Sequence, residues 1–148
     1  MVVHRERVLG LDPGYTTGYC SILRRDNSTN LISYGEIELN NMTYDWLYKL
    51  IRREKADRVV IEDVVKSGHL STDKFNQIRA FDRCYSTAKK AGIEPEIISP
   101  EIRKRGKSQS VPDSVKGTHA RDAYLIATYD TIPEDMKEEM QDETQDKS

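Results

Sequence analysis

The sequence has little cysteine and no long apolar run, and each shortage excludes a class of protein. Its two cysteines, Cys20 and Cys84, show neither the paired spacing of a zinc site nor the density of a disulfide-stapled domain. We therefore expect both to be reduced residues of the core. No apolar stretch approaches the roughly 20 residues that a membrane-spanning helix needs, and residues 1–7 contain no signal-peptide core. We expect a cytoplasmic protein without a membrane segment.

Charged residues, in contrast, are abundant and unevenly distributed. They make up 32% of the 148 residues, which is typical of one globular domain with a charged surface. Residues 131–148 hold seven acids and two lysines, whereas residues 66–121 hold twelve basic and six acidic residues. The basic middle favours a phosphate-bearing partner, although a solvated surface explains it equally well. We expect one domain over residues 1–131 and an acidic, mobile tail over residues 132–148.

Apolar periodicity and turn residues predict an α/β domain with the element order βββαβαβα. We expect strands at residues 7–12, 18–23, 31–39, 58–63 and 96–99, and helices at residues 43–54, 72–91 and 118–131. Residues 13–17 and 24–30 have turn chemistry, and residues 100–117 read as a basic, loosely structured stretch. This order predicts a mixed five-stranded sheet flanked by helices, with the first and fourth strands as parallel central neighbours.

The first two expected helices each have an apolar face at helical spacing. Asn41 or Thr43 could cap the start of the first helix, and Gly92 ends the second. The faces expected against the core are Trp46, Leu47, Leu50 and Ile51 in the first helix, and Phe75, Ile78, Phe81 or Cys84, Tyr85 and Ala88 in the second.

Three acidic residues stand in local frames that suggest a site. Asp12 lies in the Gly-Leu-Asp-Pro-Gly of residues 10–14, Glu62 ends the apolar run 59–61, and Asp122 starts the last helical pattern. A carboxylate at the end of a buried strand is costly to desolvate unless a cation compensates it. Two carboxylates about 4 Å apart repel by roughly 4 kcal/mol at an effective dielectric constant near 20. If the fold brings the three together, a divalent metal ion is the simplest explanation.

Each of these acids alone has an ordinary structural explanation. An Asp-Pro-Gly string is usually a turn, a glutamate can end a strand at the surface, and the helix dipole favours an aspartate in any first turn. Asp63 is a rival to Glu62, but successive strand residues face opposite sides of a sheet. The case for a site therefore depends on all three acids together.

These motifs, in this order, resemble those of the RuvC-type Holliday-junction resolvases. The likeness rests on residues 10–14 with Thr17-Gly18-Tyr19, on Ile61-Glu62, on the His-Ala-Arg-Asp-Ala of residues 119–123, and on Gln77 and Arg79, which resemble a Gln-x-Arg pattern. The resemblance covers residues 7–130 and implies a ribonuclease H-like fold. It also implies a homodimeric, magnesium-dependent endonuclease that nicks four-way DNA junctions.

The resemblance implies a role for each acidic residue. Asp12 would bridge two Mg²⁺ ions, Glu62 would bind one of them, and Asp122 would close the site from the last helix. His119 lies three residues before Asp122 on the same helical face, where it could be a metal ligand or orient the attacking water. Mn²⁺ could replace Mg²⁺, and no small-molecule cofactor is implied.

Basic residues near the carboxyl ends of the strands are the expected DNA contacts. The loop after Glu62 and the stretch before the last helix should both emerge at this edge, where they could follow backbone phosphates on either side of the cut. The expected DNA-binding residues are Lys66, His69, Arg79, Arg103, Lys104, Arg105, Lys107, Lys116 and Arg121. A solvated loop is the alternative explanation.

The chain departs from the family pattern in three places. Two residues separate Gly14 from Thr17, so the opening turn is one residue shorter than usual. Val65 stands where the family often has an aromatic residue that wedges into the junction, which puts that mechanism in doubt here. The stretch before His119 is also shorter, so the family's cleavage preference does not transfer. The compact chain with divergent loops suggests a viral or mobile-element protein.

A two-fold junction favours a two-fold dimer, and the long helix with Phe75, Phe81 and Tyr85 is a candidate dimer surface. Simple packing on the sheet is the alternative for that helix. One rival function is a nuclease of the same fold that cuts RNA or RNA–DNA hybrids, which the carboxylates alone cannot distinguish. A non-catalytic DNA-binding module and a sugar-kinase or actin-like ATP-binding module are the other rivals. The intact acids argue against the first, and the short chain argues against the second.

Overall fold

The computed structural model describes residues 5–26, 28–64, 71–105 and 110–131. The elements are β1 (Arg5–Asp12), β2 (Thr16–Arg25), β3 (Ser28–Glu38), α1 (Tyr44–Arg53), β4 (Arg58–Glu62), α2 (Thr72–Lys90), β5 (Glu96–Ile98), α3 (Pro100–Arg105) and α4 (Thr118–Ala127), followed by a 3-10 turn at Tyr129–Thr131. Apart from α3, the strands and helices follow the order expected from the sequence.

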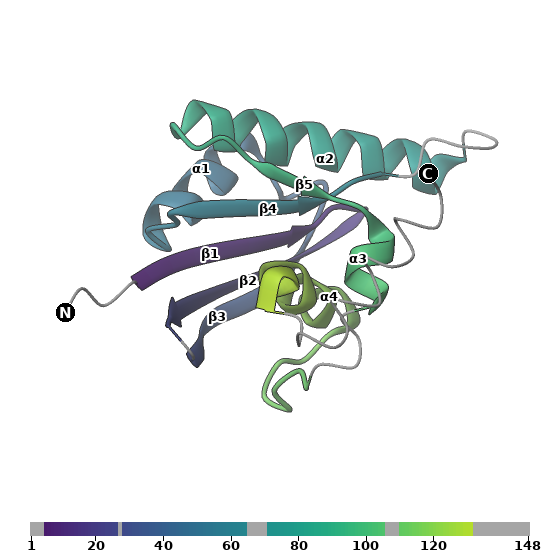
Figure 1. Ribbon diagram of the computed structural model, residues 1–148. Coiled ribbons are helices and arrows are strands. Elements are labelled where there is room, and N and C mark those ends of the chain that lie inside the picture. The colour runs from purple at the N-terminus through teal and green to yellow at the C-terminus, as the bar shows by residue number, and fades with distance from the viewer. Residues whose placement is uncertain (1–4, 27, 65–70, 106–109, 132–148) are drawn as a thin grey trace, which may run out of the picture.

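The five strands form one mixed sheet in the order β3-β2-β1-β4-β5 (Figure 1). β1, β2 and β3 pair as an antiparallel meander, whereas β4 pairs in parallel with both β1 and β5. The expectation that the first and fourth strands are parallel central neighbours is confirmed. Because parallel strands run in the same direction, the carboxyl ends of β1 and β4 lie side by side at one end of the sheet.

Helices cover both faces of the sheet, with α1 and α2 on one face and α4 on the other (Figure 1). Leu9 and Leu11 of β1 belong to the core beneath α1 and α2, whereas Val8 belongs to the core beneath α4. In β4, Val59 likewise faces α1 and α2, and Val60 faces α4. Burial on both faces explains why residues 8–11 of β1 and 59–61 of β4 include no polar side chain.

Two glycines bring the backbone of α4 directly against the sheet. A Cβ atom on Gly10 of β1 would lie 2.4 Å from the carbonyl oxygen of Ala123, and one on Gly18 of β2 would lie 2.0 Å from that of His119. No other residue type fits at such a distance, because neither contact partner is a flexible side chain. The glycines of the opening motif therefore set the distance between α4 and the ends of β1 and β2.

The N-terminal cap and the apolar face of α1 are as the sequence suggests. Thr43 accepts a hydrogen bond from the Trp46 backbone N–H at 3.1 Å, so Thr43 caps α1. Ser71 caps α2 by accepting one from the Lys74 N–H, also at 3.1 Å. The expected apolar face of α1 is confirmed, with three of its residues buried and Trp46 packed against the core.

Three local expectations are wrong. Residues 24–30 do not form an extended loop, because β2 and β3 continue until Arg25 pairs with Ser28. The stretch expected to be loose after residue 100 begins with α3. Phe75 does not face the core, since its side chain is 50% exposed. It lies in the first turn of α2, which extends beyond the ends of the strands (Figure 1).

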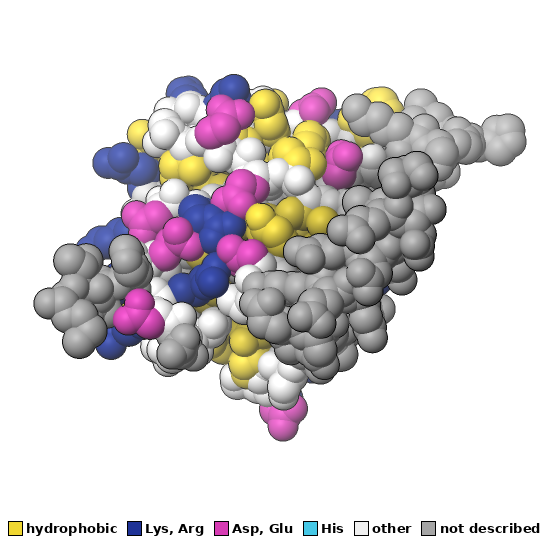
Figure 2. Space-filling model, viewed as in Figure 1, with side chains coloured by type: hydrophobic (Ala, Val, Ile, Leu, Met, Phe, Trp, Pro, Cys, Tyr) yellow, Lys and Arg dark blue, Asp and Glu magenta, His cyan; other side chains and the backbone are white. Residues whose placement is uncertain are grey.

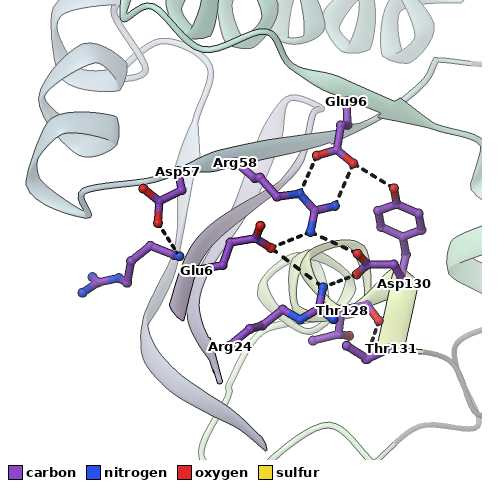
Figure 3. A network of polar contacts seen from close by, with 10 residues as sticks. Glu6, Arg24, Asp57, Arg58, Glu96, Thr128, Asp130 and Thr131 are labelled. Carbon is purple, nitrogen blue, oxygen red and sulfur yellow. Dashed lines mark hydrogen bonds and ion pairs between the residues drawn. The ribbon is translucent and has the colours of Figure 1, made fainter. Parts of the chain in front are cut away.

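Opposite-charge side chains gather at the edge of the sheet where β1 and β4 begin (Figures 2 and 3). The Arg58 guanidinium contacts both carboxylate oxygens of Glu96 at 2.6 and 2.7 Å, and it also reaches Glu6 at 2.7 Å and Asp130 at 3.0 Å. Arg24 holds the other oxygen of Asp130 at 2.7 Å. This network joins β1, β2, β4 and β5 to the turn after α4.

Three further expectations concern the cysteines, membrane segments and the acidic tail. Cys20 and Cys84 are buried free thiols, as expected. Across the described ranges, no helix combines the length and apolar character that crossing a membrane requires. The expected acidic tail, residues 132–148, lies outside the described residues.

Candidate functional site

Two of the expected acids meet where the central parallel strands end. Leu11 pairs with Ile61 in the register of β1 and β4, which places Asp12 and Glu62 next to each other. Both follow the alternation of their strands onto the α4 face, the face of Val60. Their side chains are only 14% and 7% exposed.

The first turns of α4 bring the third acid and the histidine to the same place. His119 Nδ1 lies 3.3 Å from Asp12 Oδ2. The side chain of Asp122, one turn further along α4, is 21% exposed. The carboxylate of Glu36 on β3 accepts hydrogen bonds from the backbone N–H groups of His119 and Ala120 at 2.8 and 3.2 Å. Glu36 thus caps α4 and fixes where the helix begins relative to the sheet.

The four expected residues line one cavity of about 610 Å³. Its floor is the carboxyl edge of the sheet, and its walls come from the turn after β1 and from the starts of α2, α3 and α4. The lining residues are Asp12, Pro13, Gly14, Tyr15, Thr16, Glu62, Asp63, Val64, Asp73, Lys74, Gln77, Pro100, Arg103, Lys104, His119 and Asp122. Side chains separated by more than one hundred positions in the chain therefore share a site.

Arg103 of α3 lies among the acids. Its Nε donates to Glu62 Oε1 at 2.8 Å, and its Nη1 lies 3.3 Å from Asp122 Oδ1. The guanidinium side chain is 14% exposed. From the sequence, Arg103 was expected only as one of several contacts to DNA phosphates. In the structure it bridges the two acids that come from β4 and α4.

The pKa of Asp12 responds most strongly to this arrangement of charges. Burial raises the pKa of Asp12 to about 8, and the neighbouring carboxylates of Glu62 and Asp122 contribute to the rise. The positive charge of Arg103 acts in the opposite direction but does not cancel them. Five acidic side chains line the cavity against three of lysine and arginine, so the charged form of Asp12 is unfavourable there without a further cation.

The turn that carries Asp12 is closed by a side chain of the opening motif. The Thr17 hydroxyl donates to the Gly14 carbonyl oxygen at 3.2 Å and accepts from the Gly14 N–H at 3.3 Å. Thr17 is almost fully buried. The turn that follows Asp12 is thus closed locally by this pair of hydrogen bonds.

The donor chemistry of the cavity fits a hard divalent cation. Mg²⁺ prefers oxygen ligands, and here three carboxylates face one space with excess negative charge. Within the described part of the chain, however, no three acidic, histidine or cysteine side chains already surround a common ion position. Arg103 instead pairs with Glu62 and Asp122.

The other expected DNA-binding residues are dispersed. Lys104 lines the cavity and is exposed, and Arg105 is half-buried beside it on α3. Arg79 on α2 and Lys116 before α4 are exposed. Arg121 donates to the carbonyl oxygens of Pro112 and Val115 at 3.3 and 3.1 Å, so it also holds the loop before α4. Lys66, His69 and Lys107 lie outside the described residues.

Sequence reasoning missed two residues that build this site. Glu36 has no local pattern that marks it, because its partner N–H groups lie more than eighty positions away. The pairing of Arg103 was missed because its basic neighbours on α3 made it look like one of a solvated cluster. An arginine shortly before the helix that carries Asp122 was the one available signal.

Comparison with known proteins identifies the architecture. No family model matches the sequence, and no curated protein does. Among solved structures, Thermus thermophilus RuvC in complex with a Holliday-junction substrate aligns with a TM-score of 0.67 and 14% identity, covering 84% of this chain and 91% of that one. The fowlpox virus resolvase in complex with Holliday-junction DNA aligns with a TM-score of 0.54 and 13% identity, covering 85% and 98%.

The chain has the ribonuclease H-like fold of these resolvases. At such low identity the likeness shows the fold alone, and the activity has to be argued from the site. The fold expected from the resemblance of short motifs is therefore confirmed over most of the chain.

Proposed function

We propose that the protein is a divalent-metal-dependent endonuclease that cuts branched DNA, with the four-way junction as its substrate. One observation carries the proposal: three carboxylates from β1, β4 and α4 meet in one cavity with uncompensated negative charge. The shared fold supports it, because the RuvC and fowlpox virus resolvase structures named above are complexes with Holliday-junction DNA.

Asp12, Glu62 and Asp122 would hold the metal. Two Mg²⁺ ions bound there would supply an activated water and stabilise the leaving oxygen of the cut phosphodiester. Asp12 ends the central strand β1 beside Glu62 of β4, so both carboxylates would be available to hold the metal. The His119 imidazole contacts Asp12 and is 44% exposed, so it can orient Asp12 while it accepts or donates a proton at the open side.

Exposed basic side chains would hold the DNA backbone. Lys104 on α3 lines the opening, and Arg79 and Lys116 are exposed on the neighbouring α2 and on the segment before α4. Phosphate contacts of this kind position the DNA without reading its sequence. We propose that a homodimer presents two such sites, since a two-fold junction needs two symmetric cuts.

A substrate panel tests this proposal. The protein would be incubated with four-way junction, flap, RNA–DNA hybrid and linear duplex, each with and without MgCl₂. We expect paired cuts in the four-way junction that require the metal. Preferred cutting of the hybrid would instead favour the ribonuclease alternative, and binding without any cutting would favour a non-catalytic module.

The first prediction concerns Asp12→Asn in this assay. The substitution removes a metal-binding charge without changing shape, so cutting should fall by at least about 10³-fold while junction binding remains. Asp45→Asn is the matched control, since Asp45 is an exposed residue of α1 that pairs only with Lys49 among the described residues. Cutting by Asp12→Asn at the wild-type rate would contradict the assignment.

A further inference from the structure

Arg103 is placed differently from an ordinary phosphate-binding arginine. Its guanidinium turns toward the protein, where one nitrogen lies 2.8 Å from Glu62 and another lies 3.3 Å from Asp122. Glu62 and Asp122 are themselves mostly buried. The pair of contacts joins β4 to α4 through α3, which lies at the carboxyl ends of the central strands (Figure 1).

The surroundings explain why a cation is held there. Without Arg103, the cavity would contain three buried carboxylates that repel one another, and a lone buried charge is strongly unfavourable. A guanidinium can contact two carboxylates at once because its donors spread in a planar fork. Lys104 lines the same cavity, but it makes no ion pair with any residue in the described ranges.

The oxygens that Arg103 contacts are the oxygens that a metal needs. A divalent ion and a guanidinium cannot both occupy the space between Glu62 and Asp122 at contact distance. A metal ion that binds Glu62 and Asp122 must therefore displace Arg103, and the cost of this displacement lowers the apparent affinity for the metal. The absence of a ready ion position among the described residues agrees with this competition.

Resting on the proposed function, we propose that Arg103 is a built-in counter-ion that occupies the cation position of the metal-free cavity. It keeps Glu62 and Asp122 close together before metal arrives, and it must release both when the metal binds. Arg103 thereby sets the metal concentration at which the site fills. This role differs from that of Lys104, which adds positive charge to the cavity but does not occupy the carboxylates.

Metal affinity measured without DNA tests the competition. Mn²⁺ would be titrated into the wild-type chain, Arg103→Gln and Lys104→Gln, and free Mn²⁺ followed by electron paramagnetic resonance. We expect Arg103→Gln to bind Mn²⁺ about tenfold more tightly than the wild type, with a change of less than about twofold for Lys104→Gln. Equal or weaker binding by Arg103→Gln, or an equal gain in both variants, would overturn the inference.

A measurement on the wild-type chain covers the case in which Arg103→Gln does not fold. The Arg103 Nε–H is hydrogen-bonded to Glu62, so in EDTA its proton should exchange slowly with solvent in ¹⁵N NMR spectra. Saturating MgCl₂ should abolish this protection and shift the signal. A signal that keeps both its position and its protection in MgCl₂ would show that Arg103 stays in place and would refute its role as a competing counter-ion.

The same measurements separate this inference from the proposed function. If wild type and Arg103→Gln are both folded and bind Mn²⁺ equally, and the wild type cuts junctions, only the counter-ion role fails. If neither chain binds Mn²⁺ or Mg²⁺, the proposed metal-dependent function fails and the counter-ion role fails with it.

Discussion

The acidic residues of the cavity lower the stability of the folded chain when no metal is bound. Asp12 is held at a pKa of about 8 by burial and by the charges of Glu62 and Asp122. Above about pH 4, Asp12 is ionised in the unfolded chain. The folded chain must then either keep a proton on Asp12 or place its negative charge beside those of Glu62 and Asp122. Without metal, the native state therefore loses stability as the pH rises from about 4 to 8.

The second prediction follows at this scale. Asp12→Asn should raise the free energy of unfolding in EDTA at pH 7.5, by on the order of 2 kcal/mol, since it removes the repulsion but keeps the shape. Urea unfolding of both chains measures the effect, and added MgCl₂ should reduce the difference because only the wild type gains a full metal site. A variant less stable than the wild type in EDTA would contradict the electrostatic account.

Single residues were predictable from sequence where a motif surrounds them. Asp12, Glu62 and His119 stand in short frames that mark the ends of elements, so their meeting could be expected before the structure was known. The pairing of Arg103 could not, because it depends on how α3 lies against β4 and α4. The local sequence does not indicate how α3 is oriented against β4 and α4.

At the scale of elements, α4 is positioned by contacts from three strands. Gly10 and Gly18 allow its backbone to touch β1 and β2, and Glu36 of β3 receives its first N–H groups. These contacts fix the height and rotation of the helix that carries His119 and Asp122. The geometry of the site therefore depends on a cap that lies outside the cavity lining.

The third prediction is that Glu36→Ala destabilises the protein and slows cutting. Loss of the cap should lower the free energy of unfolding by about 1 kcal/mol. It should also loosen the first turn of α4, so that cutting falls more than DNA binding does. Glu38→Ala is the matched control, because Glu38 is an exposed acid on the same face of β3. Equal effects of the two substitutions would argue against the cap.

The boundaries of elements were predicted less well than their existence. The antiparallel strands β2 and β3 extend two to three residues further than their apolar pattern, because polar residues can pair across a hairpin at the edge of a sheet. The helix α3 was missed since six residues with three basic side chains have no apolar face to reveal them. Both errors fall where backbone pairing or packing outweighs side-chain pattern.

At the scale of the whole molecule, the acids at the two ends of the central strands have pKa values shifted in opposite directions. The carboxyl ends of the strands hold the buried acids, whereas the opposite end of the sheet holds a network in which Arg24 and Arg58 pair with three carboxylates (Figure 3). Hydrogen bonds from Arg58 lower the pKa of Glu96. Burial raises the pKa of Asp130, but contacts with Arg24 and Arg58 outweigh it, and the net shift is downward. The order βββαβαβα predicted which strands end side by side and the motifs predicted the acids there, whereas nothing in the sequence indicated the network around Arg58.

The fourth prediction concerns pH and this network. Lowered carboxylate pKa values contribute stability that is fully present above the unfolded values near 4 and is lost as the pH falls below them. Arg58→Met should therefore be less stable than the wild type at pH 7, and the gap should shrink toward pH 3. Urea unfolding across this range measures the gap, with Arg52→Met, at an exposed site on α1, as the control. A gap that does not change with pH would show that the network is not linked to these protons.

The contact of α4 with the sheet has a mechanical consequence. At Gly10 and Gly18, peptide groups of helix and strand meet with no layer of side chains between them. Hydrostatic pressure acts on voids and on loosely filled layers, and direct backbone contact at Gly10 and Gly18 leaves no space for either at those two points. The contact of α4 with β1 and β2 at these two glycines should consequently be compressed less by pressure than a layer of packed side chains is.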